Sequence, residues 1–404
     1  MLCGLDQVFS GELSNVRKRL RGARVGILTH AAAVDRSGRN AVSTLDELGA
    51  SPAVVFTPEH GFFPTHQAQV PISEVPPSPD QPRFVSLYGS KKESLTPSAQ
   101  DLEGLDVLVI DLCDVGSRYY TYVWTALLAA RAAVAAGVHT LILDRPNPIS
   151  GTPTLAEGKP QEADYLSFVG LESLPVRHGL TLGELVCLFL ERDGATLGAE
   201  GAVSVVPVLG WERHQTASAW NRPFSPPSPN MPSLETALVY PGACLLEGTN
   251  LSEGRGTTLP FQMVGAPFLD AAKLATACAE LGAPGAQIRP VHFQPTFDKH
   301  AGAVCHGVLI QVTNWRLFRP IATYLSLLAL AKAQAPDTFK FTTGVYEFET
   351  GRPAFDLLTG SDAARLALVN QATPADLQDL VCRVDAGWAD VMAEAEARVE
   401  RARG

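Results

Sequence analysis

Asp106-Val107-Leu108-Val109-Ile110-Asp111 is the stretch of this chain that says most about its fold. Its consecutive Val, Leu and Ile residues are typical of a strand that is buried on both faces of a parallel sheet. More apolar runs of similar length lie around it in the chain, at residues 24–30, 53–57, 84–88 and 139–144. Helical patterns separate several of these runs, most clearly at residues 122–136, which are followed by Gly137. This alternation predicts an α/β fold with a Rossmann-like open parallel sheet.

The pattern changes in the second half of the chain, where we expect a second, smaller α/β domain. The proline-rich residues 221–232 predict a stiff, extended path over the surface, because proline fixes φ and lacks a donor. The other expected elements are helices at residues 41–48, 182–192, 270–281, 320–334 and 374–402, and strands at 203–209, 287–294 and 304–313. Pro290 would confine its strand to a sheet edge. We place the boundary near Thr258, with the Rossmann-like domain at 1–258 carrying most of the site and the smaller domain at 259–404.

The composition excludes several classes of protein. Hydrophobic residues make up 46% and charged residues 18% of the 404 residues, which is ordinary for a globular protein with a sizeable core. A net charge of −10 argues against a nucleic-acid partner, which would need a basic surface. No apolar run approaches the roughly 18 residues of a membrane span.

The expected cellular location follows from the first residues and from the cysteines. The N-terminus lacks the basic and apolar regions of a secretory signal. This predicts a cytoplasmic location for the sequence as written, or a periplasmic or secreted one if the sequence has been trimmed. The seven cysteines are scattered without a CxxC pair, which fits a reducing compartment.

Polar side chains follow three of the expected strands. Glu59 and His60 follow the second strand, Asp111 to Tyr122 follow the fourth, and Asp144 to Pro148 follow the fifth. Because ligands bind outside the carboxyl ends of the strands in an open α/β sheet, we expect these groups at one rim. The alternative is a structural role for each, such as a helix cap or an internal ion pair.

A second polar stretch runs from Leu246 to Thr257 and reads LEGTNLSEGRGT. It combines two carboxylates, a guanidinium and three glycines, a composition that favours a loop lining a site. The alternative is a solvated surface loop. Thr181 and Glu184 have the spacing of a capping box, which is a structural role, and His178 just before them is expected to face the rim. Three aromatic residues could stack on a sugar ring or belong to the core: Trp211, Trp220 and Tyr240.

Several familiar motifs are missing from the sequence. No GxGxxG follows the first expected strand, and neither GxxxxGK[ST] nor GxSxG occurs. HExxH and His-x-His are absent as well, so the sequence predicts neither a cofactor nor a metal site.

Taken in order, the motifs resemble those of a bacterial family of exo-acting β-N-acetylmuramidases. The segments that carry the resemblance are GLD at 4–6, PEHG at 58–61, SLYG at 86–89, DVGSRYYTY at 114–122, LDRPNP at 143–148, RHG at 177–179, SPNMP at 228–232, EGTN at 247–250 and SEGRGT at 252–257. The resemblance implies removal of N-acetylmuramic acid from the non-reducing end of peptidoglycan fragments, in cell-wall recycling or degradation. It also implies a cleft between a Rossmann-like domain and a smaller α/β domain. The chain departs from the family at Cys113, where Gln is usual, and at Phe62-Phe63-Pro64, where a basic residue is usual.

Cleavage of a glycosidic bond needs a proton for the leaving oxygen and stabilisation of an oxocarbenium-like centre. We expect Glu59 to be the general acid and Glu247 to be the second carboxylate, with Glu253 and Asp114 as rivals for the latter role. Alternatively, the 2-acetamido carbonyl of the substrate is the nucleophile, and the second acid only orients the amide.

Muramic acid carries a lactyl carboxylate, for which an Arg fork is the fitting partner. Arg118, Arg145 and Arg255 are the candidates, and the alternative for each is an internal pair with Asp114, Asp144 or Glu253. The residues expected to bind a small saccharide or muropeptide are His60, Asp114, Arg118, Tyr120, Arg145, Asn147, His178, Asn250, Glu253 and Arg255. Two other classes of function are weighed against this one: a non-catalytic sugar- or peptidoglycan-binding protein, and an oxidoreductase, which the missing glycine fingerprint disfavours.

Overall fold

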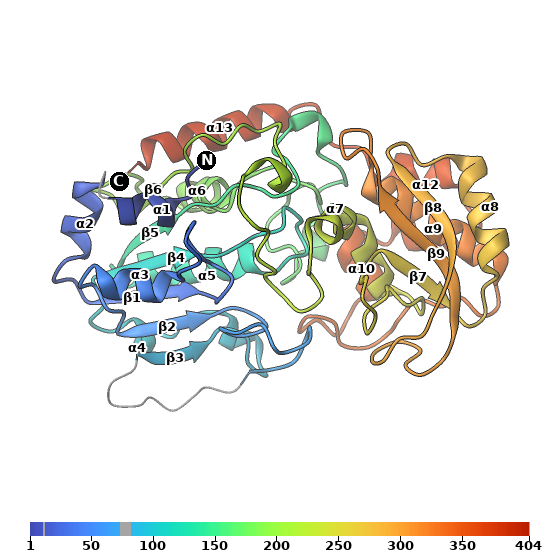
Figure 1. Ribbon diagram of the computed structural model, residues 1–404, viewed down its shortest axis with the longest axis horizontal. Coiled ribbons are helices and arrows are strands. Elements are labelled where there is room, and N and C mark those ends of the chain that lie inside the picture. Colours follow the sequence, from blue (N-terminus) through green and yellow to red (C-terminus); the bar gives the residue numbers. More distant parts are fainter. Residues whose placement is uncertain (11–12, 73–81, 404) are drawn as a thin grey trace.

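The computed structural model describes residues 1–10, 13–72 and 82–403, which form two domains side by side (Figure 1). Within these residues, the first domain is built on a sheet of six parallel strands in the order β3-β2-β1-β4-β5-β6. Its strands are β1 (Val25–Thr29), β2 (Val54–Thr57), β3 (Arg83–Ser86), β4 (Val107–Asp111), β5 (His139–Leu143) and β6 (Val203–Val206). The Rossmann-like parallel sheet predicted from the apolar runs is confirmed.

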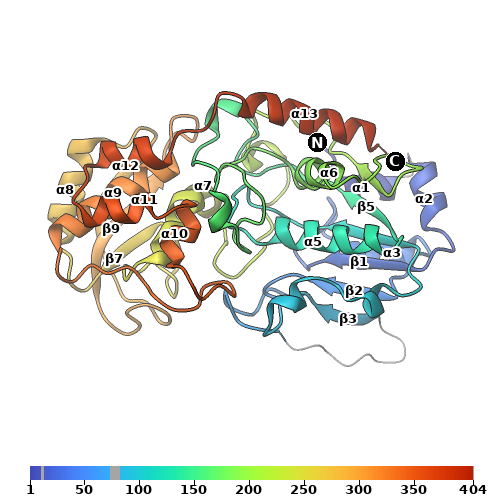
Figure 2. The same ribbon diagram turned by 180° about the vertical axis from the view of Figure 1, so that it is seen from behind.

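Helices cover both faces of this sheet (Figures 1 and 2). They are α1 (Gly4–Ser10), α2 (Ser14–Leu20), α3 (Ala41–Glu47), α4 (Ala99–Leu102), α5 (Tyr122–Ala135) and α6 (Leu182–Arg192). Along β4, Val107 and Val109 belong to the core shared with α1, α2 and α3, whereas Leu108 and Ile110 belong to the core shared with α5 and α6. Because successive side chains of a strand point to opposite faces, an uninterrupted apolar run is what a sheet covered on both faces requires.

The second domain is built on a small antiparallel sheet, β7-β9-β8, in the described residues. Its elements are β7 (Met263–Ala266), β8 (Ala286–Phe293), β9 (Cys305–Val312), α8 (Ala271–Leu281), α9 (Pro320–Gln334), α10 (Ala354–Thr359), α11 (Ala363–Val369) and α12 (Pro374–Val381). The strand β8 lies at the edge of this sheet, as Pro290 within it predicts, because proline cannot donate to a second neighbour. The predicted boundary near Thr258 stays a prediction.

The predicted long helix over residues 374–402 is wrong. The chain forms α12 and then a separate helix α13 (Trp388–Arg401), which crosses back and packs along α6 of the first domain (Figures 1 and 2). Asp385 interrupts the helical pattern, since its carboxylate accepts from the backbone N–H of Gly387 at 2.9 Å. The Trp388 indole then donates to the carbonyl of His178 at 2.9 Å and anchors the start of α13 on the first domain.

Short helices complete the chain. The helix α7 (Leu234–Ala243) continues into a 3-10 helix η5 (Cys244–Gly248), and the remaining 3-10 turns are η1 (Lys92–Leu95), η2 (Pro153–Leu155), η3 (Ala163–Tyr165) and η4 (Ala217–Ala219). Apart from the C-terminal helix, the predicted helices and strands are confirmed with boundaries shifted by a few residues. In the part of the chain that the structure describes, no helix has the length and apolarity needed to cross a membrane.

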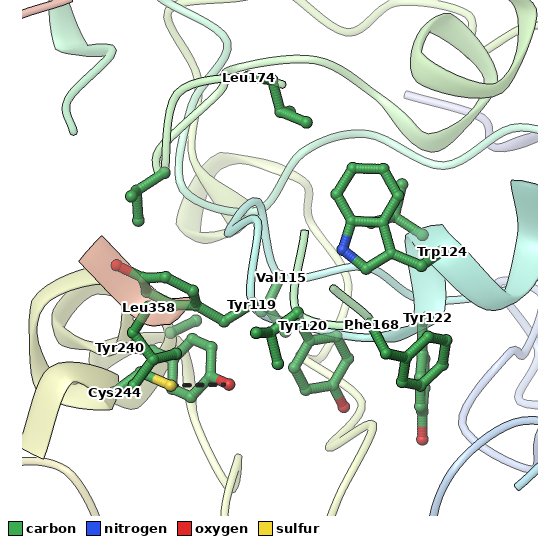
Figure 3. Close-up of a cluster of buried hydrophobic side chains, with 14 of the residues drawn as sticks. Val115, Tyr119, Tyr120, Tyr122, Trp124, Phe168, Leu174, Tyr240, Cys244 and Leu358 are labelled. Carbon is green, nitrogen blue, oxygen red and sulfur yellow. Dashed lines mark hydrogen bonds between the residues drawn. The ribbon is translucent and has the colours of Figure 1, made fainter. Parts of the chain in front are cut away.

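Aromatic side chains join the first domain to α7 (Leu234–Ala243), a helix that packs on α9 of the second domain. Tyr119 and Tyr120, just before α5, contact Tyr240 of α7 edge to face, with ring centroids 6.5 and 6.0 Å apart (Figure 3). Tyr240 in turn packs on Phe261, with centroids 4.9 Å apart. Each such aromatic pair stabilises the fold by roughly 0.5–1.5 kcal/mol beyond the effect of the surface area it buries. This aromatic layer therefore holds α7 in a defined position against the first domain.

Candidate active site

Two adjoining cavities lie where the domains meet. The outer one has a volume of about 430 Å³ and the inner one about 40 Å³. They share the lining residues Ala68, Glu247, Arg255 and Tyr346. The outer volume falls within the range of ligand-binding pockets.

Glu59 enters the inner cavity from the carboxyl end of β2. The chain turns sharply here, with φ of 72° at His60 and 81° at Gly61. One Glu59 oxygen accepts from the backbone N–H of Gln69 at 2.9 Å and the other from the Thr121 hydroxyl at 2.8 Å. The carboxyl group is therefore held in one orientation, and the residue is only 5% exposed.

Glu247 enters the same cavity from η5 in the second half of the chain. One of its oxygens accepts from the Arg255 guanidinium at 2.6 Å, and the other accepts from the Tyr346 hydroxyl at 2.7 Å. A Cβ added at Gly248 would lie 2.6 Å from backbone atoms of Phe355, so η5 can approach α10 this closely only with glycine at this position.

Arg255 lies between two carboxylates. Besides Glu247, it contacts Glu253 at 3.1 Å, and Lys299 contacts the other oxygen of Glu253 at 3.0 Å. Burial works to raise the pKa of Glu253, but the charges of Lys299 and Arg255 hold it below its usual value. Burial lowers the pKa of Arg255, but the negative charges of Glu247 and Glu253 outweigh this effect. The pKa of Arg255 therefore lies above its usual value. Glu253 and Arg255 line the outer cavity together with Lys299.

A third acid in the inner cavity, Glu347, was missed by the sequence analysis. It lies in the segment between α9 and α10, and it accepts from the Tyr88 hydroxyl at 2.9 Å. Burial, followed by the charge of Glu59, raises its pKa well above the usual value. Glu347 and Phe348 both have a positive φ, of 46° and 69°, which costs on the order of 1–3 kcal/mol for a non-glycine residue. No strand end or glycine-rich stretch precedes Glu347, so the signals that identified Glu59 and Glu247 are missing there.

Comparison with known proteins decides the family. The family of N-terminal domains of the exo-β-N-acetylmuramidase NamZ matches residues 25–235 of this chain. The family of the corresponding C-terminal domains matches residues 238–392. The chain belongs to this family. It is therefore a glycoside hydrolase, as the ordered motifs predicted.

Individual relatives agree with this assignment. The chain is 37% identical over 362 residues to the peptidoglycan β-N-acetylmuramidase NamZ of Bacillus subtilis (strain 168), covering 89% of this chain and 83% of that protein. A crystal structure of a DUF1343 family protein from Bacteroides fragilis NCTC 9343 superposes with a TM-score of 0.81 at 27% identity, covering 98% of both chains. A second DUF1343 protein of the same organism gives a TM-score of 0.69 at 25% identity, covering 100% of this chain and 98% of that one.

Other residues predicted from the sequence also line the two cavities. The structure brings His60, Tyr120 and Tyr240 to the inner cavity. The His60 Nδ1 lies 2.8 Å from the carbonyl of His66, so this nitrogen carries the ring proton in that contact. Tyr240 is thus the one of the three candidate stacking residues that reaches this cavity.

Among the predicted substrate ligands that lie outside both cavities, Arg118, Asn147 and Asn250 form hydrogen bonds with the backbone. The buried guanidinium of Arg118 donates to the carbonyls of Lys159, Leu174 and Leu358. The Asn147 amide donates to the carbonyl of Leu180, and its oxygen accepts from the N–H of Ile149. The Asn250 amide likewise pairs with the backbone of Thr338 and Lys340.

The ends of β4 and β5 lie at a third cavity, of about 50 Å³, lined by Cys113, Asp114 and Arg145 among others. Arg145 is paired with Asp111, at 2.5 and 2.9 Å, and not with Asp144, the partner considered from the sequence. The single rim expected from the strand ends is therefore divided in two. Glu59 and His60, at the end of β2, line the inner cavity with Glu247 and Glu347, and so do Tyr119 to Thr121 beyond β4. Cys113, Asp114 and Arg145 line the other cavity instead. Phe62 and Phe63 line a separate apolar groove.

Asp114 and His178 are buried neighbours, with Oδ2 and Nε2 3.8 Å apart. Burial raises the pKa of Asp114 to about 7, against the backbone hydrogen bonds from Gly116 and Val115. Burial also lowers the pKa of His178 to about 3, helped by the charge of Arg118. At neutral pH the His178 ring is therefore uncharged, and the two residues do not form an ion pair.

The raised pKa of Asp114 predicts a pH-dependent stability. An acid whose pKa is 3.8 when unfolded and about 7 when folded contributes its full stability below pH 3.8, and this is lost as the pH rises toward 7. The loss is at most ~1.4 kcal/mol per pH unit. Asp114→Asn cannot ionise and keeps an acceptor for the N–H of Gly116. The melting temperature of the variant minus that of the wild type should therefore increase as the pH is raised from 5 to 8. An unchanged difference between the two proteins over this range would contradict the assignment.

Among the residues that the structure describes, no three His, Cys, Asp or Glu side chains are grouped in a way that could hold a metal ion. The acids that line the two cavities are Glu59, Glu247, Glu253, Asp298 and Glu347, and Arg255 and Lys299 are the cations beside them.

Proposed function

We propose that this enzyme releases N-acetylmuramic acid from the non-reducing end of peptidoglycan fragments. The observation that carries the proposal is the convergence of Glu59, Glu247 and Glu347, from three distant parts of the chain, on one small cavity. Family membership and the name of the Bacillus subtilis relative support a peptidoglycan glycoside hydrolase. A cleft whose inner end narrows to about 40 Å³ fits a chain end better than the middle of a polysaccharide.

The lactyl carboxylate of muramic acid needs a cation, and Arg255 is our choice among the three arginines considered from the sequence. Arg255 lines both cavities, whereas Arg118 and Arg145 line neither of them. Arg255 already pairs with two carboxylates, those of Glu247 and Glu253. Lys299, which also lines the outer cavity, adds a second positive charge through its pair with Glu253.

Glu59 and Glu247 are the catalytic carboxyl groups of this proposal. One stabilises the positive charge that develops at the anomeric carbon, or orients the 2-acetamido group as the nucleophile. The other acts on the water that completes hydrolysis. The substrate is a small saccharide or muropeptide, and the cytoplasmic location expected from the sequence, like the periplasmic or secreted alternative, stays a prediction.

Incubation with purified muropeptides, followed by mass analysis of the products, tests the proposal. The expected product is free N-acetylmuramic acid, with each fragment shortened by one terminal sugar. Binding without any product would favour the non-catalytic sugar-binding alternative. Internal cleavage into larger fragments would contradict exo-action but keep the glycoside hydrolase.

A further inference from the structure

Glu347 is a carboxyl group in the inner cavity that neither the family motifs found in the sequence nor the proposed catalytic pair uses. It is 6% exposed, and it lines the cavity together with Glu59 and Glu247. A buried acid without a role is costly to keep, because burial disfavours its charged form.

The segment that carries Glu347 is held against the first domain on several sides. The Tyr88 hydroxyl donates to one Glu347 oxygen, and the Phe348 ring packs edge to face on the Tyr88 ring, with centroids 5.4 Å apart. Beyond them, Lys92 pairs with Glu349 at 2.6 Å. These contacts keep Glu347 and Phe348 at positive φ, a conformation that persists only where the surroundings impose it. Contacts with the first domain thus hold the segment in one conformation, with Glu347 lining the cavity.

The charges around the cavity distinguish the three acids. Glu247 is paired with Arg255 at 2.6 Å. Glu59 accepts hydrogen bonds at both of its oxygens. Glu347 forms no ion pair among the described residues, and Tyr88 donates to only one of its oxygens. Burial and the neighbouring charge of Glu59 raise the pKa of Glu347 well above its usual value, which favours the protonated form of this carboxyl group.

We propose that Glu347 is the general acid that protonates the leaving glycosidic oxygen, in place of Glu59, which we expected in that role from the sequence. This inference rests on the proposed function. The bond between the anomeric carbon and the glycosidic oxygen breaks, its electron pair stays on the oxygen, and the oxygen takes the proton of Glu347. Water then adds to the anomeric carbon and its proton returns to a carboxylate of the cavity, so the enzyme regains the protons with which it began. Glu59 and Glu247 keep the roles proposed above.

Two substrates with different leaving groups test this assignment. Glu347→Gln should lower turnover of a muropeptide, whose leaving sugar needs a proton, by about 100-fold, within the range that general acids contribute. Turnover of a 2,4-dinitrophenyl muramide, whose leaving group needs little protonation, should fall by less than about fivefold. A purely structural role would lower both rates by the same factor, so equal losses would overturn the proposal.

Further variants separate this inference from its neighbours. Glu280→Gln, which changes an exposed acid of α8 that lines neither cavity, is the control and should keep its activity on both substrates. If Glu59→Gln showed the dependence on leaving group and Glu347→Gln did not, Glu59 would be the acid. A wild-type enzyme that released no muramic acid from either substrate would instead refute the proposed function itself.

The pH profile gives a second readout. Activity that requires protonated Glu347 declines as the pH rises through its raised pKa. Because the hydrogen bond from Tyr88 lowers that pKa, Tyr88→Phe should move the alkaline decline of the muropeptide rate to higher pH. A decline that stayed in place in Tyr88→Phe, and that persisted in Glu347→Gln, would overturn the assignment.

Discussion

Glu59→Gln should lower the release of N-acetylmuramic acid by roughly 10³- to 10⁴-fold, at the upper end of what one positioned group contributes. Two hydrogen bonds orient this carboxyl toward the cavity, from the N–H of Gln69 and the hydroxyl of Thr121. Gln removes the carboxylate that, in the proposed mechanism, stabilises the charge at the anomeric carbon or acts on the attacking water. It also turns an amide N–H₂ toward one of these donors, so the side chain loses its orientation as well.

The measurement is the initial rate of muramic acid release from a muropeptide and from a chromogenic muramide. Both should fall by a similar factor, because a group that acts on the anomeric centre is needed for either leaving group. Thr121→Val, which removes one of the two orienting donors and no charge, is the graded control and should lose much less. Wild-type turnover in Glu59→Gln would refute the catalytic role of Glu59.

Arg255→Met should have the largest effect on stability, a loss of about 3–5 kcal/mol. The guanidinium is only 9% exposed and is paired with both Glu247 and Glu253. Removing it leaves Glu247 without its charged partner although the Glu247 side chain is largely buried, and a buried unpaired charge is strongly destabilising. Activity should be lost as well, since Arg255 is also the proposed ligand of the lactyl carboxylate.

Thermal melting of Arg255→Met and of the double variant Arg255→Met/Glu247→Gln measures this effect. The double variant no longer carries the unpaired charge, so it should recover part of the lost stability although it has one substitution more. Lys273→Met is the control, because Lys273 pairs with Asp270 on the exposed surface, where such a pair contributes little. A melting temperature of Arg255→Met equal to that of Lys273→Met would contradict the prediction.

The candidate site could be predicted from the sequence only in part, and the reason differs from residue to residue. Glu59 was found because it follows a buried strand, and Glu247 because a polar, glycine-rich stretch surrounds it. Asn147 and Arg145 also follow a strand, but their side chains are used inside the protein, by the carbonyl of Leu180 and the carboxylate of Asp111. A buried polar group has to be paired, and a pattern of residue types does not show which partner it finds.

The sequence by itself determined the layered α/β architecture, because apolar runs and their periodicity report directly which strands and helices are buried. It also determined that β8 is an edge strand, since the chemistry of Pro290 allows no other place. Only the tertiary structure decided which acids meet: Glu347 reaches the cavity through Tyr88, a contact between residues 259 positions apart. It also decided that residues 382–387 leave the helical path so that α13 can return to α6. Contacts at such distances along the chain depend on how whole domains pack, and no local pattern of residues records them.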